Sequence, residues 1–171
     1  MNMKKFFIAG LCIVFVTGYS FAQSFEVPAT YSFKNKEECA TFEKDILAAS
    51  KWLFATPSDE QEAKRKQVAK FVAEWVLNSS TVNAEMTSAI MDFENTNPGM
   101  MALYFAGCSW YVLENNYSAD IRAKHRFALQ AMMEYYKNNS LKRDKKMREL
   151  IKQNKDGKLD EWIEINMPLR S

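Results

Sequence analysis

The side chains able to carry chemistry in this 171-residue chain are few, and His125 is its single histidine. Nucleophilic catalysis needs a base beside the nucleophile, and structural metal sites need clustered histidine and cysteine ligands. The sequence has no such cluster. On helical spacing His125 falls on an apolar stripe between Ile121 and Ala128. We therefore expect a buried, hydrogen-bonded histidine, no metal site and no cofactor.

The segment Gly107-Cys108-Ser109-Trp110 superficially resembles the active-site segment of papain-like cysteine proteases. That family needs a downstream histidine and asparagine on a partly β scaffold. Here the one histidine follows Cys108 by 17 residues, within a helical pattern. Cys108 also lies in an apolar run, where a thiolate is disfavoured. The sequence therefore predicts that Cys108 is not a catalytic nucleophile.

Cys39 and Cys108 are the two cysteines that remain if the N-terminal segment holding Cys12 is removed. An exported protein can form disulfides, and a bridge across these 69 positions would stabilise the fold by about 4 kcal/mol. Both cysteines also fall in apolar helical patterns that suit buried free thiols. The sequence leaves open a disulfide between Cys39 and Cys108 or two free thiols.

Residues 154–160 resemble the middle of an EF-hand calcium loop, with Gly157 at the position of its invariant glycine. The first and last ligand positions then fall on Lys152 and Ile163, which offer no carboxylate. We predict instead a joint between two helices, with Gly157 in the left-handed conformation and Asp160 near the next N-terminus.

Three carboxylates lie at the ends of predicted helices: Asp92, Glu94 and Glu114. Two acids can hydrolyse a glycosidic bond when their separation is about 5 to 9.5 Å, which the sequence does not give. Most surface acids are only solvated. A carboxylate-dependent hydrolase of envelope sugars therefore stays as an alternative to a protein without catalytic activity.

Charge is distributed unevenly along the chain. Residues 137–158 hold nine basic and three acidic residues, a net charge of +6, while the rest of the chain after residue 22 carries −6. Such a block suits an anionic partner, although a solvated helix face would show the same pattern. Because the chain after residue 22 is neutral overall, we predict no nucleic-acid binding. The candidate residues are Lys142, Arg143, Lys145, Lys146, Arg148, Lys152 and Lys155.

Residues 1–22 have the pattern of a secretory signal peptide: a positive start, an apolar stretch over residues 6–16 and small residues at 20 and 22. The apolar stretch is too short to span a bilayer. We predict cleavage before Gln23, a periplasmic or secreted protein, and no transmembrane segment once the signal is removed.

Helical patterns dominate after an extended N-terminal arm at residues 23–34. We predict an all-α fold in which residues 35–171 form a single compact domain of six or seven antiparallel helices. Residues 98–114 are expected to be its buried central helix, because residues 100–113 carry no charge. We expect helices to start at Asn35, at Ser58, at Asn97 with Pro98, and at Ser118. A shorter helix between the second and the central one is expected to carry Val82 and Met86.

Several tracts resemble a family of small exported helical proteins of Gram-negative bacteria with no known activity. The tracts are Lys51-Trp52-Leu53 with Thr56-Pro57, Asn97-Pro98, Phe105-Ala106-Gly107, Tyr111 with Leu113-Glu114-Asn115, and Gly157-Lys158-Leu159 with Trp162-Ile163. The resemblance implies export and a helical fold, and assigns no functional residue.

The sequence therefore predicts a non-enzymatic binding or structural module for a protein or an anionic envelope component. A small-molecule carrier is a further alternative, which would require an apolar cavity of a few hundred Å³.

Overall fold

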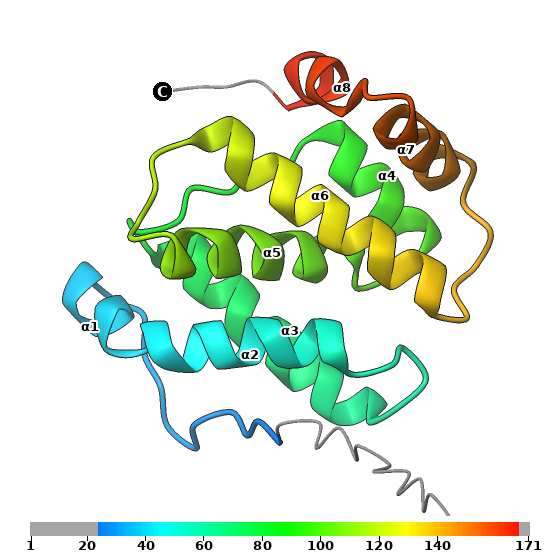
Figure 1. Ribbon diagram of the computed structural model, residues 1–171. Coiled ribbons are helices and arrows are strands. Elements are labelled where there is room, and N and C mark those ends of the chain that lie inside the picture. Colours follow the sequence, from blue (N-terminus) through cyan, green and yellow to red (C-terminus); the bar gives the residue numbers. More distant parts are fainter. Residues whose placement is uncertain (1–23, 168–171) are drawn as a thin grey trace, which may run out of the picture.

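The computed structural model describes residues 24–167, which contain eight α-helices and no strand (Figure 1). The all-α prediction is confirmed. The predicted signal peptide and its cleavage before Gln23 lie outside the described residues. The helices are α1 (Lys36–Thr41), α2 (Glu43–Ala55), α3 (Glu62–Asn78), α4 (Ser88–Thr96), α5 (Met100–Glu114), α6 (Ile121–Asn138), α7 (Lys145–Lys155) and α8 (Leu159–Asn166).

Helix α5 is the centre of the fold, as predicted. It packs against α6 on one side and against α2 and α3 on the other, and it also contacts α4 (Figure 1). Its buried residues lie on nearly every side of the helix, which explains why the sequence from 100 to 113 carries no charge. Helices α7 and α8 pack together and onto α6, farther from the centre.

The close approach of α5 to α6 depends on Gly107. A Cβ atom at this position would lie 2.7 Å from the Cα of Ala128 and 2.9 Å from its Cβ. Carbon atoms in good contact are about 3.5–4.0 Å apart. The absence of a side chain at Gly107 therefore sets the distance between the two helices.

The start of α5 differs from the prediction. Asn97 does not cap it: Asn97 ends α4, and its side chain bonds both backbone groups of Lys142. The cap residue is Gly99, whose φ of +100° lies in the left-handed region that favours glycine. The Glu94 carboxylate accepts hydrogen bonds from the backbone N–H groups of Gly99 and Met101. An acid from the preceding helix thus provides the hydrogen-bond acceptor for backbone N–H groups at the start of α5.

The predicted first helix is divided into α1 and α2, which accounts for the eighth helix. The break falls at Phe42, whose φ and ψ are −100° and 2°. The Phe42 ring packs edge-on against Phe33 and Phe71, at 5.5 and 6.2 Å between centroids. The aromatic contacts and the break in the helix therefore occur at the same residue.

Other helices begin later than predicted. Helix α4 starts after Thr87, so the preceding segment with Val82 and Met86 is not helical. Helix α3 follows Gln61 rather than Ser58, and α6 is capped by Asp120, which accepts from Ala123 N. In each case the residues before the helix form a loop, and the loop before α4 buries the side chain of Val82.

The segment before α1 lies against the bundle through its aromatic side chains. The rings of Phe25, Tyr31 and Phe33 have centroids 6.3, 4.9 and 5.6 Å from that of Phe71. Phe71 is fully buried on α3. None of the helices in residues 24–167 is both long enough and apolar enough to cross a bilayer.

Candidate functional site

The basic residues predicted from the sequence gather on one outer part of the molecule, in α7 and the loop before it. We call this set the basic face: Lys142, Arg143, Lys145, Lys146, Arg148, Lys152 and Lys155, all exposed. Lys146 pairs with Asp92 of α4. The other six form no ion pair with any residue of the described chain.

Four members of the basic face lie along one side of α7. Their positions, 145, 148, 152 and 155, are three, four and three residues apart, which places them in one row on a helix. The opposite side buries Met147 and Leu150 against the bundle. The amphipathic pattern of α7 therefore turns the row of cations outward.

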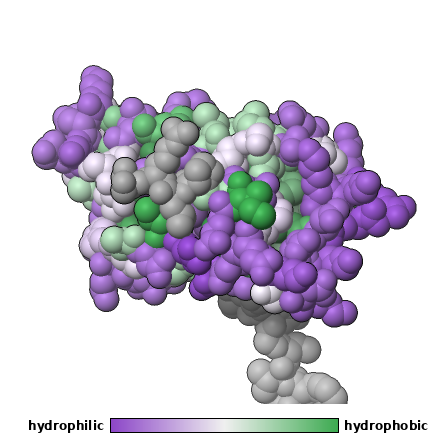
Figure 2. All heavy atoms as spheres, turned by 90° about the horizontal axis from the view of Figure 1, so that it is seen from above, coloured by the Kyte–Doolittle hydropathy of each residue, from purple (hydrophilic) through white to green (hydrophobic). Residues whose placement is uncertain are grey.

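The loop that leads into α7 is anchored by buried polar contacts. The Asn97 amide donates to Lys142 O at 3.1 Å and accepts from Lys142 N at 2.8 Å. Asp144, which is 3% exposed, accepts from the backbone N–H groups of Lys146 and Met147 and so caps α7. Figure 2, which looks onto the α7 and α8 side, shows a mainly hydrophilic surface with small, separated hydrophobic patches.

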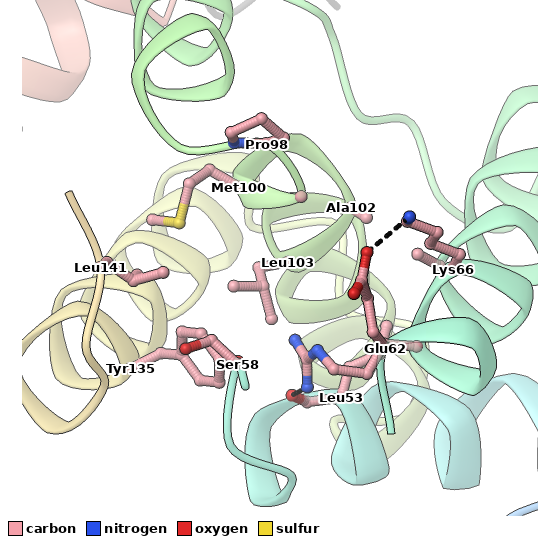
Figure 3. A pocket seen from close by; sticks show the side chains of 13 residues that line it. Leu53, Ser58, Glu62, Lys66, Pro98, Met100, Ala102, Leu103, Tyr135 and Leu141 are labelled. Carbon is pink, nitrogen blue, oxygen red and sulfur yellow. Dashed lines mark hydrogen bonds and ion pairs between the residues drawn. The ribbon is translucent and has the colours of Figure 1, made fainter. Parts of the chain in front are cut away.

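A pocket of about 330 Å³ opens between the start of α3, the start of α5 and the end of α6 (Figure 3). Figure 3 shows Met100, Leu103, Tyr135 and Leu141 converging on it from three segments of the chain. The apolar wall also includes Leu53 and Ala69. We call this cavity the Arg65 pocket, after the guanidinium in its wall.

Arg65 is held in that wall by the backbone. Its Nη1 donates to the carbonyl oxygens of Leu53 and Thr56, at 3.0 and 2.6 Å. Its guanidinium carbon lies 5.3 Å from the centroid of the Tyr135 ring, a cation–π contact. Burial lowers the pKa of Arg65 from its usual value, but a guanidinium stays charged at neutral pH.

The charge of Arg65 is not matched by a nearby acid. No carboxylate of residues 24–167 lies within 4.0 Å of its nitrogen atoms. Glu62 also lines the pocket but pairs with Lys66 at 2.7 Å, and both side chains are three-quarters exposed at the rim. The pocket thus combines an apolar wall with one fixed positive charge.

A second, smaller pocket of about 200 Å³ lies where α4, α7 and α8 meet. Asp92 and Glu149 both line it, beside Lys146 and Trp162. Of the acids proposed from the sequence, Asp92 alone faces this pocket. Glu94 caps α5, and Glu114 pairs with Lys51 and accepts from Trp110. The three predicted acids therefore serve different local structures.

Cys39 and Cys108 are both free thiols, so the structure does not adopt the disulfide alternative. Cys39 lies on α1, where its carbonyl accepts from the Trp75 indole N–H at 2.8 Å. Cys108 lies in the centre of α5. Burial raises the pKa of Cys108 to about 12. A thiol with such a pKa is protonated at neutral pH, and the protonated thiol is a weak nucleophile.

His125 is 4% exposed, and its Nδ1 shares a hydrogen bond of 2.8 Å with the Tyr104 hydroxyl, as expected. Burial lowers the pKa of His125 to about 4. The neighbouring Lys124 is also buried and donates to the carbonyl of Asn83. Burial lowers the pKa of Lys124 as well.

The joint between α7 and α8 has the predicted form. Gly157 has a φ of +74°, and Asp160, in the first turn of α8, accepts two hydrogen bonds of 2.8 Å from Arg126. Within residues 24–167, no group of three or more histidine, cysteine and acidic side chains is placed to hold a metal ion.

Comparison of the chain with protein-family models, with curated proteins and with solved structures gives no significant match. The basic face and the two pockets are therefore the features of the molecule from which a function can be inferred.

The Arg65 pocket was not predicted from the sequence. One signal was present: Arg65 precedes Val68 by three residues and Val72 by seven, so a charge interrupts the apolar stripe of α3. The other walls come from segments far apart in the chain, which no local pattern connects.

Proposed function

We propose that this protein is an exported, non-enzymatic binding protein that holds an anionic component of the cell envelope on its basic face. The observation that carries the proposal is the row of four outward cations on α7. Six of the seven residues of the basic face have no acidic partner in residues 24–167. Export is part of the proposal and rests on the predicted signal peptide.

The shape of the basic face favours a broad anionic surface over a small anion. Four of its seven cations lie in a row along a helix 11 residues long, and none of these four lines either of the two pockets described above. Lysine side chains bind as separate point charges, which suits a partner with repeated negative charges. Each basic residue near an anionic lipid surface contributes about 1 kcal/mol to binding.

The second pocket favours a second candidate, the hydrolase of envelope sugars. Asp92 and Glu149 line one cavity with Trp162, and an aromatic ring beside two acids is an arrangement that a sugar ring would suit. Against it, Asp92 is already paired with Lys146. If the chain hydrolyses envelope polysaccharide, Asp92→Asn and Glu149→Gln should each abolish that activity.

The experiment that tests the basic face is sedimentation of the purified protein with lipid vesicles. We expect binding to vesicles that contain phosphatidylglycerol, little binding to phosphatidylcholine alone, and weaker binding as salt is raised. Reversing Lys142, Lys145, Lys146 and Lys152 to Glu should weaken the binding at least a hundredfold, since about four cationic contacts are lost.

A matched control reverses four lysines elsewhere: Lys34, Lys36, Lys44 and Lys70. Each is exposed, and Lys70 is in an ion pair, as Lys146 is in the test set. The two variants therefore have the same net charge. If both lose vesicle binding equally, total charge and not the basic face is responsible, and the proposal is wrong.

A further inference from the structure

We propose that the Arg65 pocket binds a small apolar molecule that carries one carboxylate group. This site is separate from the basic face, since no residue of that face lines the pocket. The inference depends on three properties of the pocket: its volume, its apolar wall and its unmatched positive charge.

The volume sets the size of the ligand. Ligand pockets commonly measure about 300–1,000 Å³, so a cavity of about 330 Å³ is at the small end of this range. It equals about eleven water-sized volumes of about 30 Å³ each. A ligand of roughly ten non-hydrogen atoms fills this space. A two-chain lipid or an oligosaccharide is too large to be enclosed.

The wall sets the body of the ligand. Leu53, Met100, Leu103, Leu141 and the ring of Tyr135 present mainly carbon atoms to the cavity. An aliphatic or aromatic body would be removed from water on binding, which is favourable in proportion to the apolar area buried. A strongly hydrated body, such as a sugar, would lose hydrogen bonds to water without replacement.

Arg65 sets the polar end of the ligand. A guanidinium has five N–H donors, and the two carbonyls of Leu53 and Thr56 are bonded by Nη1 alone. Within residues 24–167 the Nε and Nη2 donors have no acceptor other than the Tyr135 hydroxyl, and their planar fork matches the two oxygens of a carboxylate. The same backbone bonds fix the guanidinium before the ligand arrives, which lowers the entropy lost on binding.

The remaining charges at the pocket do not oppose an anion. Glu62 and Lys66 form an ion pair at the rim, so their charges cancel. The Ser58 hydroxyl is a further hydrogen-bond donor in the lining. One anionic group bound at Arg65 would give the partly buried cation the partner that the described chain does not provide.

The test uses octanoate, which has ten non-hydrogen atoms, and octanamide, a neutral molecule of the same size. In calorimetric titrations of the wild-type protein we expect octanoate to bind with a millimolar or lower Kd. Octanamide should bind at least tenfold more weakly, because a hydrogen bond between charged groups is replaced by one to a neutral amide.

Two variants locate the site. Ala102→Phe, at a half-buried position of the lining, should fill the cavity and abolish octanoate binding. Arg65→Gln should remove the preference for octanoate over octanamide. Arg65 also bonds two carbonyls, so its replacement can affect folding, and the fold of each variant is checked by circular dichroism. If Arg65→Gln does not fold, Ala102→Phe alone shows whether octanoate binds in the Arg65 pocket.

The control is the basic-face variant with Lys142, Lys145, Lys146 and Lys152 reversed to Glu, which should bind octanoate as the wild type does. The proposal is overturned if octanoate does not bind, if octanamide binds equally well, or if folded Ala102→Phe binds octanoate unchanged. Loss of octanoate binding in the basic-face variant would also overturn it, because the anion would then be held at the surface.

Discussion

The buried contact between α5 and α6 contains several titratable side chains in a small space. Tyr104 and Cys108 on α5 face Lys124 and His125 on α6, and all four are at least 94% buried. Burial disfavours the charged form of each, which raises the pKa of Tyr104 and Cys108 and lowers that of Lys124 and His125. Their hydrogen bonds stay within the protein, so we assign them to the stability of the fold.

His125 makes the stability depend on pH. Its pKa falls from 6.5 in the unfolded chain to about 4 in the folded protein, so between these values only the unfolded state takes up the proton. Stability therefore decreases as the pH falls through this window. Between about pH 7 and pH 5 the decrease due to His125 should be about 2 kcal/mol.

Urea unfolding of the wild type and of His125→Asn at both pH values measures this contribution. Asparagine keeps a polar group beside the Tyr104 hydroxyl and does not titrate. The variant should be less stable at neutral pH but should lose less stability on acidification. An equal loss in the two proteins would show that His125 is not the titrating group.

At the scale of the helices, the packing of α5 against α6 depends on a glycine, Gly107, which has no side chain. An alanine in the middle of a helix is usually about 1 kcal/mol better than a glycine. At Gly107 the added Cβ would meet the backbone of Ala128 at 2.7 Å, and this backbone belongs to the same helix that carries His125. The steric term and the helix propensity therefore act in opposite directions.

We predict that Gly107→Ala destabilises the protein by about 1–3 kcal/mol, because α6 must move away from α5. Ser109→Ala on the same helix is the control: its buried hydroxyl has no hydrogen-bond partner within residues 24–167, so its removal should leave stability unchanged or raise it. Chemical denaturation measures both. A Gly107→Ala protein as stable as the wild type would contradict the close contact.

Sequence patterns predicted the helices well where the signal was local. The uncharged run at 100–113 identified the central helix, and Gly157 identified the joint between α7 and α8. The start of α5 was placed wrongly because the Asn97 side chain bonds Lys142, 45 residues away, instead of its own helix. Such a partner exists only in the folded chain.

At the scale of the whole molecule, the candidate site was predicted in part. The seven basic residues are close in the sequence, and the helix period alone places four of them, at positions 145, 148, 152 and 155, in one row on α7. The Arg65 pocket is different, because its walls come from α2, α3, α5, α6 and the loop after α6. A cavity formed by segments so far apart depends on how helices pack, which composition and periodicity do not specify.

Without residues 1–22 the chain has no net charge, but its positive and negative charges are separated along the sequence. After residue 22, the segment 137–158 carries +6 and the remainder −6. Because the total is zero, the protein as a whole is not drawn to an anionic surface, and any attraction depends on orientation. The basic face would then contact the anionic envelope, and the acidic remainder of the protein would point away from it.

Fractionation of a Gram-negative host that expresses the full chain tests the central claim most directly. The mature protein, with a mass corresponding to a start at Gln23, should sediment with the envelope and be released by high salt. The variant with Lys142, Lys145, Lys146 and Lys152 reversed to Glu should appear in the soluble periplasmic fraction. Equal sedimentation of variant and wild type would contradict the account, as would an uncleaved chain that stays in the cytoplasm.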